Sequence, residues 1–200
     1  ALNAQLYIGG TVDFTTTGEN QTLDNNTTKI YRSTNFSILP EAGYYLSEDM
    51  AIGGKVGLSM QRYNQDPGGD DNIESLLKFH VAPYVRKYFS LGEKLYAFGQ
   101  GGISLSAGKK KYTVADNTYD GESVTDFSFT IKPGLEYKLT KQFSAQLYVG
   151  AFGYYITREK EPDNPAQGFN ETITHDKSFK FNVGFNHLQI GIKYYLKPAK

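Results

Sequence analysis

The chain repeats one pattern three times, as FSILPEAGYYL at 36–46, FHVAPYVRKYF at 79–89 and FTIKPGLEYKL at 129–139. Each copy reads Phe-x-aliphatic-x-Pro and closes on aromatic and apolar residues. A weaker fourth copy, HLQIGIKYYL, occupies 187–196. Alternating apolar and polar residues over segments of this length predict β-strands, and repetition of the segment predicts repeated strands of one sheet.

A short polar link follows each of the three full copies, at 47–49, 92–94 and 140–142. A second alternating segment follows each link, over 50–63, 95–107 and 143–155. Short links between alternating segments predict antiparallel hairpins. Together with the opening segment at 5–15, the sequence predicts eight strands.

The other connections are long and polar, at 16–33, 64–74, 108–125 and 157–177. They are rich in Asn, Asp, Thr, Gly and Pro without helical periodicity, so we expect irregular loops. Every short turn then lies at one end of the strands and every long loop at the other. The sequence predicts an all-β, eight-stranded antiparallel up-and-down transmembrane barrel, formed by a single domain over 1–200 with a tail or linker at 197–200.

Composition excludes several other classes of protein. The 21 Lys and Arg balance the 21 Asp and Glu, so net charge gives no reason to expect a nucleic-acid partner. The chain has no cysteine, which rules out disulfides and thiolate ligands. No apolar run approaches the roughly 18 residues of a transmembrane helix, whereas a membrane strand needs only alternation over about 10 residues.

Each predicted strand has one apolar and one polar face, and alternation alone does not say which faces outward. A soluble barrel turns the apolar face inward, whereas an outer-membrane barrel turns it toward lipid. The segregated short and long connections, a polar face rich in Gly and Ser, and aromatic residues near the short turns favour the membrane. We expect an aromatic girdle of Tyr44, Tyr88, Phe89, Tyr137, Phe143 and Tyr194, with Tyr45, Tyr96 and Tyr195 beside them.

Two irregularities are expected within the strands. Pro40, Pro83 and Pro133 lie in mid-strand, and a closed barrel offers no edge to accommodate them, so we expect a bulge at each. The last strand changes phase, with apolar residues at odd positions up to 185 and at even positions from 188. That change predicts a further bulge near Asn186 and His187.

The repeated Phe-x-Ile-x-Pro strand, the three-residue turns and the closing aromatic strand resemble the OmpA/OmpX-like family of small outer-membrane barrels. The resemblance covers essentially the whole chain and implies the fold and the outer membrane of a Gram-negative bacterium. It carries no invariant catalytic residue. Members often end on an aromatic residue, whereas four residues follow Leu196 here, which would suit a linker toward a periplasmic domain such as some members carry.

Charged residues on the polar face predict a network inside the barrel. If Leu46 and Met50 pair across the first short turn, the antiparallel register places Glu41 opposite Lys55. A charge in a narrow lumen is costly unless it is paired and hydrogen-bonded. We expect a lumen charge network of Glu41, Lys55, Arg86, Lys132, Glu136 and Lys193, with Glu41 on Lys55 or Arg86 and Glu136 on Lys132 or Lys193.

The sequence predicts no catalytic site. His80 belongs to the polar face, where we expect it to join hydrogen bonds, and His175 has no nucleophile placed by spacing. Acidic groups in the loops match no calcium-binding spacing, so neither a metal nor a cofactor is expected. The run from Lys109 to Lys111 could contact lipopolysaccharide phosphates or form a solvated strand end.

Four functions stay open on these observations. The leading interpretation is a structural anchor or interaction protein that displays extracellular loops and has a lumen closed by charged residues. The alternatives are a small-solute or ion channel, an accessory subunit of a larger outer-membrane complex, and a lipid-modifying enzyme. Eight strands leave an interior just wide enough for side chains, which argues against an open pore. The expected partners are outer-membrane lipids, lipopolysaccharide and other outer-membrane proteins.

Overall fold

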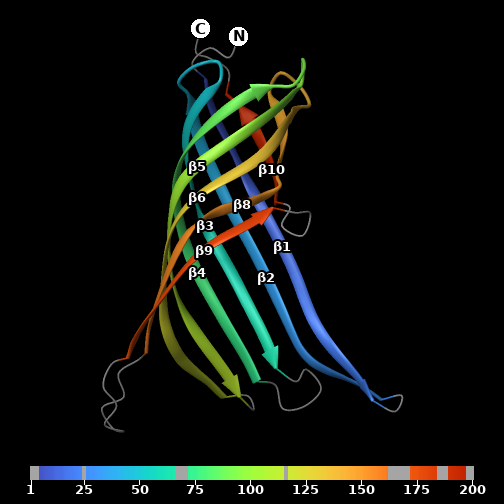
Figure 1. Cartoon of the computed structure of the whole chain (residues 1–200), viewed down its shortest axis with the longest axis vertical. Coiled ribbons are helices and arrows are strands. Elements are labelled where there is room, and N and C mark those ends of the chain that lie inside the picture. The colour runs from blue at the N-terminus through green and yellow to red at the C-terminus, as the bar shows by residue number, and fades with distance from the viewer. Residues whose placement is uncertain are drawn as a thin grey trace.

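The computed structural model describes residues 5–23, 26–65, 72–114, 117–161, 172–183 and 189–196 (Figure 1). None of the described residues forms a helix long and apolar enough to cross a membrane. The strands are β1 (Leu6–Leu23), β2 (Asn26–Tyr45), β3 (Met50–Gln65), β4 (Asn72–Ser90), β5 (Leu95–Val114), β6 (Asn117–Lys138), β7 (Phe143–Tyr148), β8 (Gly150–Lys160), β9 (Ile173–Val183) and β10 (Gln189–Tyr195).

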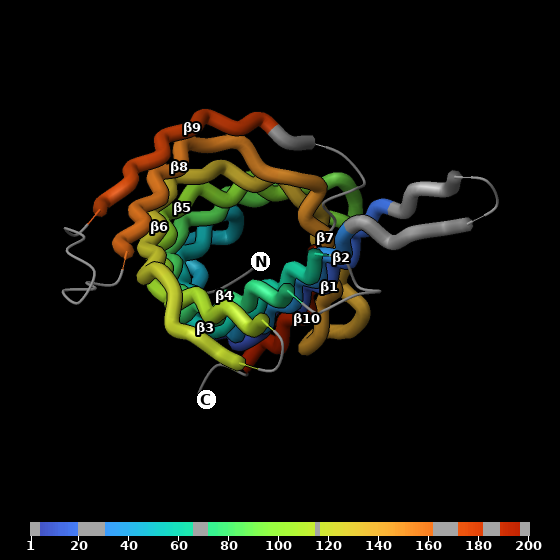
Figure 2. The backbone as a smooth tube through the Cα atoms, turned by 90° about the horizontal axis from the view of Figure 1, so that it is seen from below, coloured from blue at the N-terminus to red at the C-terminus, as the bar shows by residue number. Residues whose placement is uncertain are grey.

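These strands close into a ring of antiparallel neighbours, seen from the loop end in Figure 2. Pairing runs β5-β4-β3-β2-β1-β10-β7-β6, and β5 then pairs with β6. The seventh member of the ring consists of β7 and β8, which both pair with β6, and β9 and β10 together make the eighth. The predicted barrel of eight strands is therefore confirmed.

The ring differs between its two ends. Near the termini β10 bridges β1 and β7, which completes the circle. Toward the loop end, among the described residues, β9 pairs only with β8, and β1 beyond Val12 pairs only with β2. The bulge expected near Asn186 and His187, like the tail at 197–200, lies outside the described residues.

The short turns hold the hairpins in register in the same way each time. The backbone N–H of Leu46 donates to the carbonyl of Met50, and Leu91 and Leu139 make the same bond to the residue four positions later, at 2.8–2.9 Å. In the first hairpin this register puts Glu41 opposite Lys55. The turns lie at the end of the barrel where β1 begins and β10 ends (Figure 1).

Much of what the sequence predicted as irregular loop is paired strand, so those boundaries were wrong. The β1–β2 hairpin stays paired to Leu23 and Asn26, and the β5–β6 hairpin to Val114 and Asn117. Beyond the bilayer both faces of a hairpin meet water, so a polar segment without an apolar face can still pair through its backbone.

The prolines disturb the ladder less than expected. At Pro40 and Pro83 the pairing with one neighbouring strand is interrupted, but the register is the same on both sides, so no bulge forms. Beside Pro133 the expected bulge is present, on the neighbouring strand: Gly134 pairs with Tyr148 but Ile131 pairs with Phe152, which leaves one extra residue between β7 and β8, where Gly150 has φ 131°. Because L side chains rarely adopt that φ, glycine suits the position.

Within the barrel wall, the described side chains of most strands alternate between the outside and the lumen. The outward positions expose apolar residues, among them Val12, Ile38, Leu58, Val81, Leu105, Phe129 and Ile192. The inward positions bury charged and polar residues, among them Glu41, Lys55, Arg86, Gln100, Glu136, Gln146 and Lys193. This is the reverse of a soluble barrel, and it places the apolar surface where lipid would contact it.

Candidate functional site in the lumen

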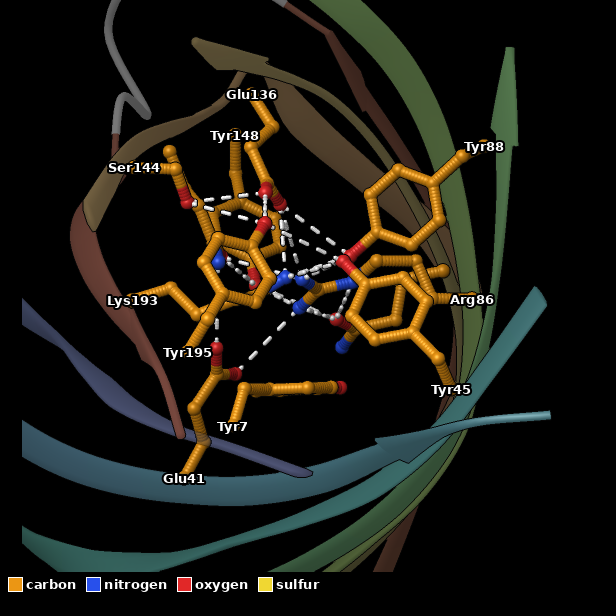
Figure 3. A network of polar contacts seen from close by, with 12 residues as sticks. Tyr7, Glu41, Tyr45, Arg86, Tyr88, Glu136, Ser144, Tyr148, Lys193 and Tyr195 are labelled. Carbon is orange, nitrogen blue, oxygen red and sulfur yellow. Dashed lines mark hydrogen bonds and ion pairs between the residues drawn. The ribbon is translucent and has the colours of Figure 1, made fainter. Parts of the chain in front are cut away.

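Eight inward side chains form a connected set that we call the lumen network: Glu41, Lys55, Arg86, Gln100, Glu136, Gln146, Tyr148 and Lys193. Figure 3 shows the centre of this set, with Glu41, Arg86, Glu136, Tyr148 and Lys193 labelled. They come from β2, β3, β4, β5, β6, β7 and β10, so nearly the whole circumference contributes. The set holds three cations and two carboxylates, which leaves one positive charge in excess.

Arg86 is the centre of the lumen network and is fully buried. Its Nε and Nη2 both donate to Oε1 of Gln100, at 3.2 and 2.7 Å, and Nη2 also donates to the hydroxyl of Tyr148 at 2.7 Å. Its Nη1 donates to Oε1 of Gln146 at 3.3 Å. The planar guanidinium offers five donors in a fixed fork, which suits it to join several strands at once.

Glu41 balances the cations on one side of this centre. Its Oε2 lies 3.4 Å from Nη2 of Arg86 and 3.6 Å from Nζ of Lys55. Tyr84 donates its hydroxyl to the same oxygen at 3.1 Å, and Gln146 donates to Oε1 at 3.4 Å. A buried carboxylate with this many donors is satisfied in its charged form.

Glu136 and Lys193 form the second ion pair, with 2.8 Å between Nζ and Oε2. Ser144 donates to Oε1 of Glu136 at 2.9 Å, and the hydroxyl of Tyr195 also bonds that oxygen. The distance from Oε2 of Glu136 to Nη1 of Arg86 is 3.9 Å, which joins the two ion pairs into one network.

Lys132, which the sequence placed in the same charge network, is not part of it. Glu136 pairs with Lys193 and Arg86, and within the described residues Lys132 makes neither a hydrogen bond nor an ion pair. Lys132 and Glu136 share the inward face of β6 but lie four residues apart, about 13 Å along a strand. That separation is too great for direct contact on the β6 side.

A cage of tyrosines surrounds the charges on the side of the short turns. Lys193 donates to the hydroxyl of Tyr88 at 2.6 Å and of Tyr45 at 3.3 Å, and its Nζ lies 4.3 Å from the ring centre of Tyr7. The rings of Tyr45 and Tyr88 stack with centroids 5.5 Å apart. Their phenols supply polar contacts and their rings supply cation–π contacts.

This cage corrects the expected aromatic girdle. Tyr88 is 4% exposed and faces the lumen, as do Tyr45 and Tyr195, whereas Tyr44, Phe89, Tyr137 and Phe143 are exposed on the outside and Tyr194 is partly exposed. Neighbouring residues on a strand point to opposite faces, so only one member of each adjacent aromatic pair can reach lipid. On each strand, the inward tyrosines are an even number of residues away from the inward charged residues, so alternation places them on the same face. The girdle prediction did not use this pattern.

A second polar group lies closer to the loop end. Asp126 accepts hydrogen bonds from Lys78 at 2.7 Å, Ser106 at 2.8 Å and Thr157 at 2.8 Å. His80 is hydrogen bonded to Ser59 at 2.6 Å. Among the described residues, no group of His, Asp and Glu is arranged to hold a metal ion.

The three consecutive lysines of β5 divide between the two faces. Lys110 points inward and is held by Glu159 at 3.1 Å, Glu74 at 3.7 Å and Glu122 at 3.9 Å. Lys109 points outward and pairs with Asp120 at 2.7 Å. Lys111, also outward and exposed, makes no ion pair with a described carboxylate.

The sequence matches no protein-family model and no curated protein. The structure does resemble solved proteins, among them the outer membrane protein OprG from Pseudomonas aeruginosa. The superposition covers 98% of this chain and 97% of the OprG chain, with 12% sequence identity and a TM-score of 0.59. The chain has the fold of the small outer-membrane β-barrels.

Two further barrels superpose more loosely. Neisserial surface protein A covers 94% of this chain and 96% of its own, with 12% identity and a TM-score of 0.43. Ail of Yersinia pestis covers 98% and 100%, with 13% identity and a TM-score of 0.45. The fold, the outward apolar band and the buried lumen charges together describe an outer-membrane β-barrel.

Proposed function

We propose that this outer-membrane barrel is a closed anchor, sealed by the lumen network, that presents its strand extensions and loops outside the cell. The fully buried guanidinium of Arg86 carries the proposal. It contacts side chains from β2, β5, β6 and β7, which lie around the ring, and so ties opposite walls together. At the level of the lumen network, an eight-stranded barrel has room for little besides such side chains.

The polar groups nearer the loop end support a binding role over a catalytic one. Ser59 and His80 resemble two members of a hydrolytic triad. The nearby carboxylate of Asp126 is occupied by Lys78, Ser106 and Thr157 and makes no hydrogen bond to His80. We therefore assign no enzymatic activity to the lumen.

Lipopolysaccharide is the partner that we propose for the outer surface. Arg62, Lys111 and Arg158 are exposed and occupy outward positions. All three lie near the end of the outer apolar band that is farther from the short turns. Guanidinium and ammonium groups at that level suit the phosphates of an outer-leaflet lipid. Charge-reversing all three should weaken binding of purified lipopolysaccharide while the barrel remains folded.

Conductance in a planar lipid bilayer tests the seal. Wild-type protein should give no steady current, and Arg86→Ala, which removes the centre of the network, should give discrete openings. The openings would also show that the protein inserts under these conditions. Lys87→Ala changes the next residue, which faces outward, and should stay silent. Steady conductance of the wild type would reject the anchor and favour the channel.

A further inference from the structure

A chamber lies on the loop side of the lumen network. It is a cavity of about 790 Å³ bordered mostly by β3, β4, β5, β6, β8 and β9, with Ser37 and Leu39 of β2 and Gln189 of β10 also on its lining. Lys55 and Gln100 of the lumen network form part of its floor. A neighbouring cavity of about 400 Å³ shares Ser59 and His80 with it and reaches Asp13 on β1.

One strand lines the chamber with donors that have no partner. Ser128, Thr130 and Lys132 occupy successive inward positions of β6, and all three border the cavity. Across the described part of the chain, none of these three side chains makes a hydrogen bond or an ion pair, although Ser128 and Thr130 are buried. Their hydroxyl oxygens are not sealed inside the wall but reach the cavity, where they can donate hydrogen bonds to a bound group.

Lys132 differs from the inward cations of β3, β4 and β10, which contact carboxylates. Lys55 contacts Glu41, Lys193 contacts Glu136, and Lys78 contacts Asp126. Lys180 of β9 also borders the chamber without an ion pair to a described carboxylate, but its Nζ lies over the ring of Tyr155 at 5.5 Å. A partly buried ammonium without a carboxylate is unfavourable unless an anion or water satisfies it. Lys132 therefore offers a charge that the protein itself leaves uncompensated.

The nearby carboxylates do not fill this role. Asp126 is saturated by three donors, and Glu41 and Glu136 belong to the lumen network. Asp13 is near enough to interact electrostatically with Lys132 but forms no ion pair with it. Asp176 of β9 also borders the chamber, opposite Thr157 and nearer the loop end, and it forms no ion pair with Lys132. The lumen network adds its own excess positive charge beneath the chamber.

We propose that this chamber binds the carboxylate or phosphate group of a small hydrophilic solute, with Lys132 as its charge partner and the hydroxyls of Thr130 and Ser128 as hydrogen-bond donors. The three inward positions span about 13 Å along β6. A row of this length can hold an oxyanion at one end and the polar body of the solute along the rest. The site does not depend on whether the lumen network blocks ions.

The test uses lysine-labelled, full-length protein in detergent micelles, titrated with inorganic phosphate or with succinate at constant ionic strength. The side-chain NMR signal of Lys132, assigned from its loss in Lys132→Arg, should shift and saturate with at least one of the two anions. Saturation with succinate alone identifies a carboxylate site, and saturation with phosphate alone identifies a phosphate site. The exposed Lys87 provides the control signal and should not saturate.

Variants followed by calorimetry separate the site from general attraction. Lys132→Met should weaken binding at least about tenfold, because an ion pair is lost from a poorly solvated site. Lys132→Arg should retain binding, and Asp13→Asn should strengthen it by removing a repelling charge. Thr130→Val should weaken binding, whereas Thr125→Val on the outward face of the same strand should not.

The proposal is overturned if neither anion moves the Lys132 signal saturably, or if Lys132 and Lys87 respond alike. Thr130→Val and Asp13→Asn keep the test decisive if Lys132→Met does not fold. Bilayer conductance reports separately on the seal, so saturable binding by a conducting barrel would reject the anchor and leave this site intact.

Discussion

Replacing Glu41 by glutamine tests the lumen network most directly. The carboxylate lies 3.4 Å from Arg86 and 3.6 Å from Lys55, and all three side chains are buried. The amide keeps the size of the side chain but leaves three network cations with one carboxylate. Removing one partner of a buried ion pair costs about 3–5 kcal/mol. Because the amide oxygen can still accept from Tyr84, we expect a loss near the lower end, about 3 kcal/mol.

The assay is guanidinium unfolding in lipid vesicles, with the folded fraction taken from circular dichroism and from the shifted gel mobility of the unheated barrel. Glu48→Gln makes the same chemical change in an exposed turn and should alter the free energy of unfolding by less than about 0.5 kcal/mol. Equal effects of the two substitutions would refute the argument.

The excess positive charge of the lumen network allows a second test, which is specific for charge balance. Lys55→Met removes a cation and leaves two cations with two carboxylates, so no charge is stranded. It should therefore destabilise the barrel by at least about 1 kcal/mol less than Glu41→Gln. The opposite order would show that charge balance does not govern the lumen.

Three further predictions concern packing, the turn and the membrane face. Gly134→Ala should destabilise the barrel by about 1–3 kcal/mol, because the new methyl group meets a phenylalanine ring and a backbone carbonyl, whereas Gly99→Ala has open space and should be neutral or slightly stabilising. The hydrogen bonds from Lys87 and Ser47 hold the pKa of Asp49 below its usual value, so any stability that this carboxylate adds is present above its unfolded pKa and is lost as pH falls through its folded pKa. Lys87→Met should raise the Asp49 pKa in an NMR titration, and an unchanged pKa would contradict that cause. Because the chain has no cysteine, a spin label at Val85→Cys should collide with oxygen dissolved in the bilayer, and one at Asp49→Cys with an aqueous nickel complex; aqueous quenching of both would place the wall outside lipid.

Local periodicity determined the strands and their register. The repeated Phe-x-aliphatic-x-Pro segment, the three short links and the period-two alternation were enough to predict eight antiparallel strands. They also placed Glu41 opposite Lys55, because an antiparallel pair keeps the sum of partner numbers constant after a short turn. The same alternation contained the inward position of Tyr88, although the girdle prediction overlooked it.

Contacts across the lumen were decided only by the tertiary structure. Alternation predicts that Lys132, Glu136 and Lys193 all face inward. It does not predict that Glu136 pairs with Lys193 while Lys132 lies farther toward the loop end without contacting Glu136. Those partners lie on strands far apart in sequence, and their heights depend on the tilt and stagger with which the ring closes. The extended pairing of the polar hairpins at the loop end could not be predicted either. Backbone hydrogen bonds hold these hairpins together, and their sequences have no apolar pattern that would indicate a strand.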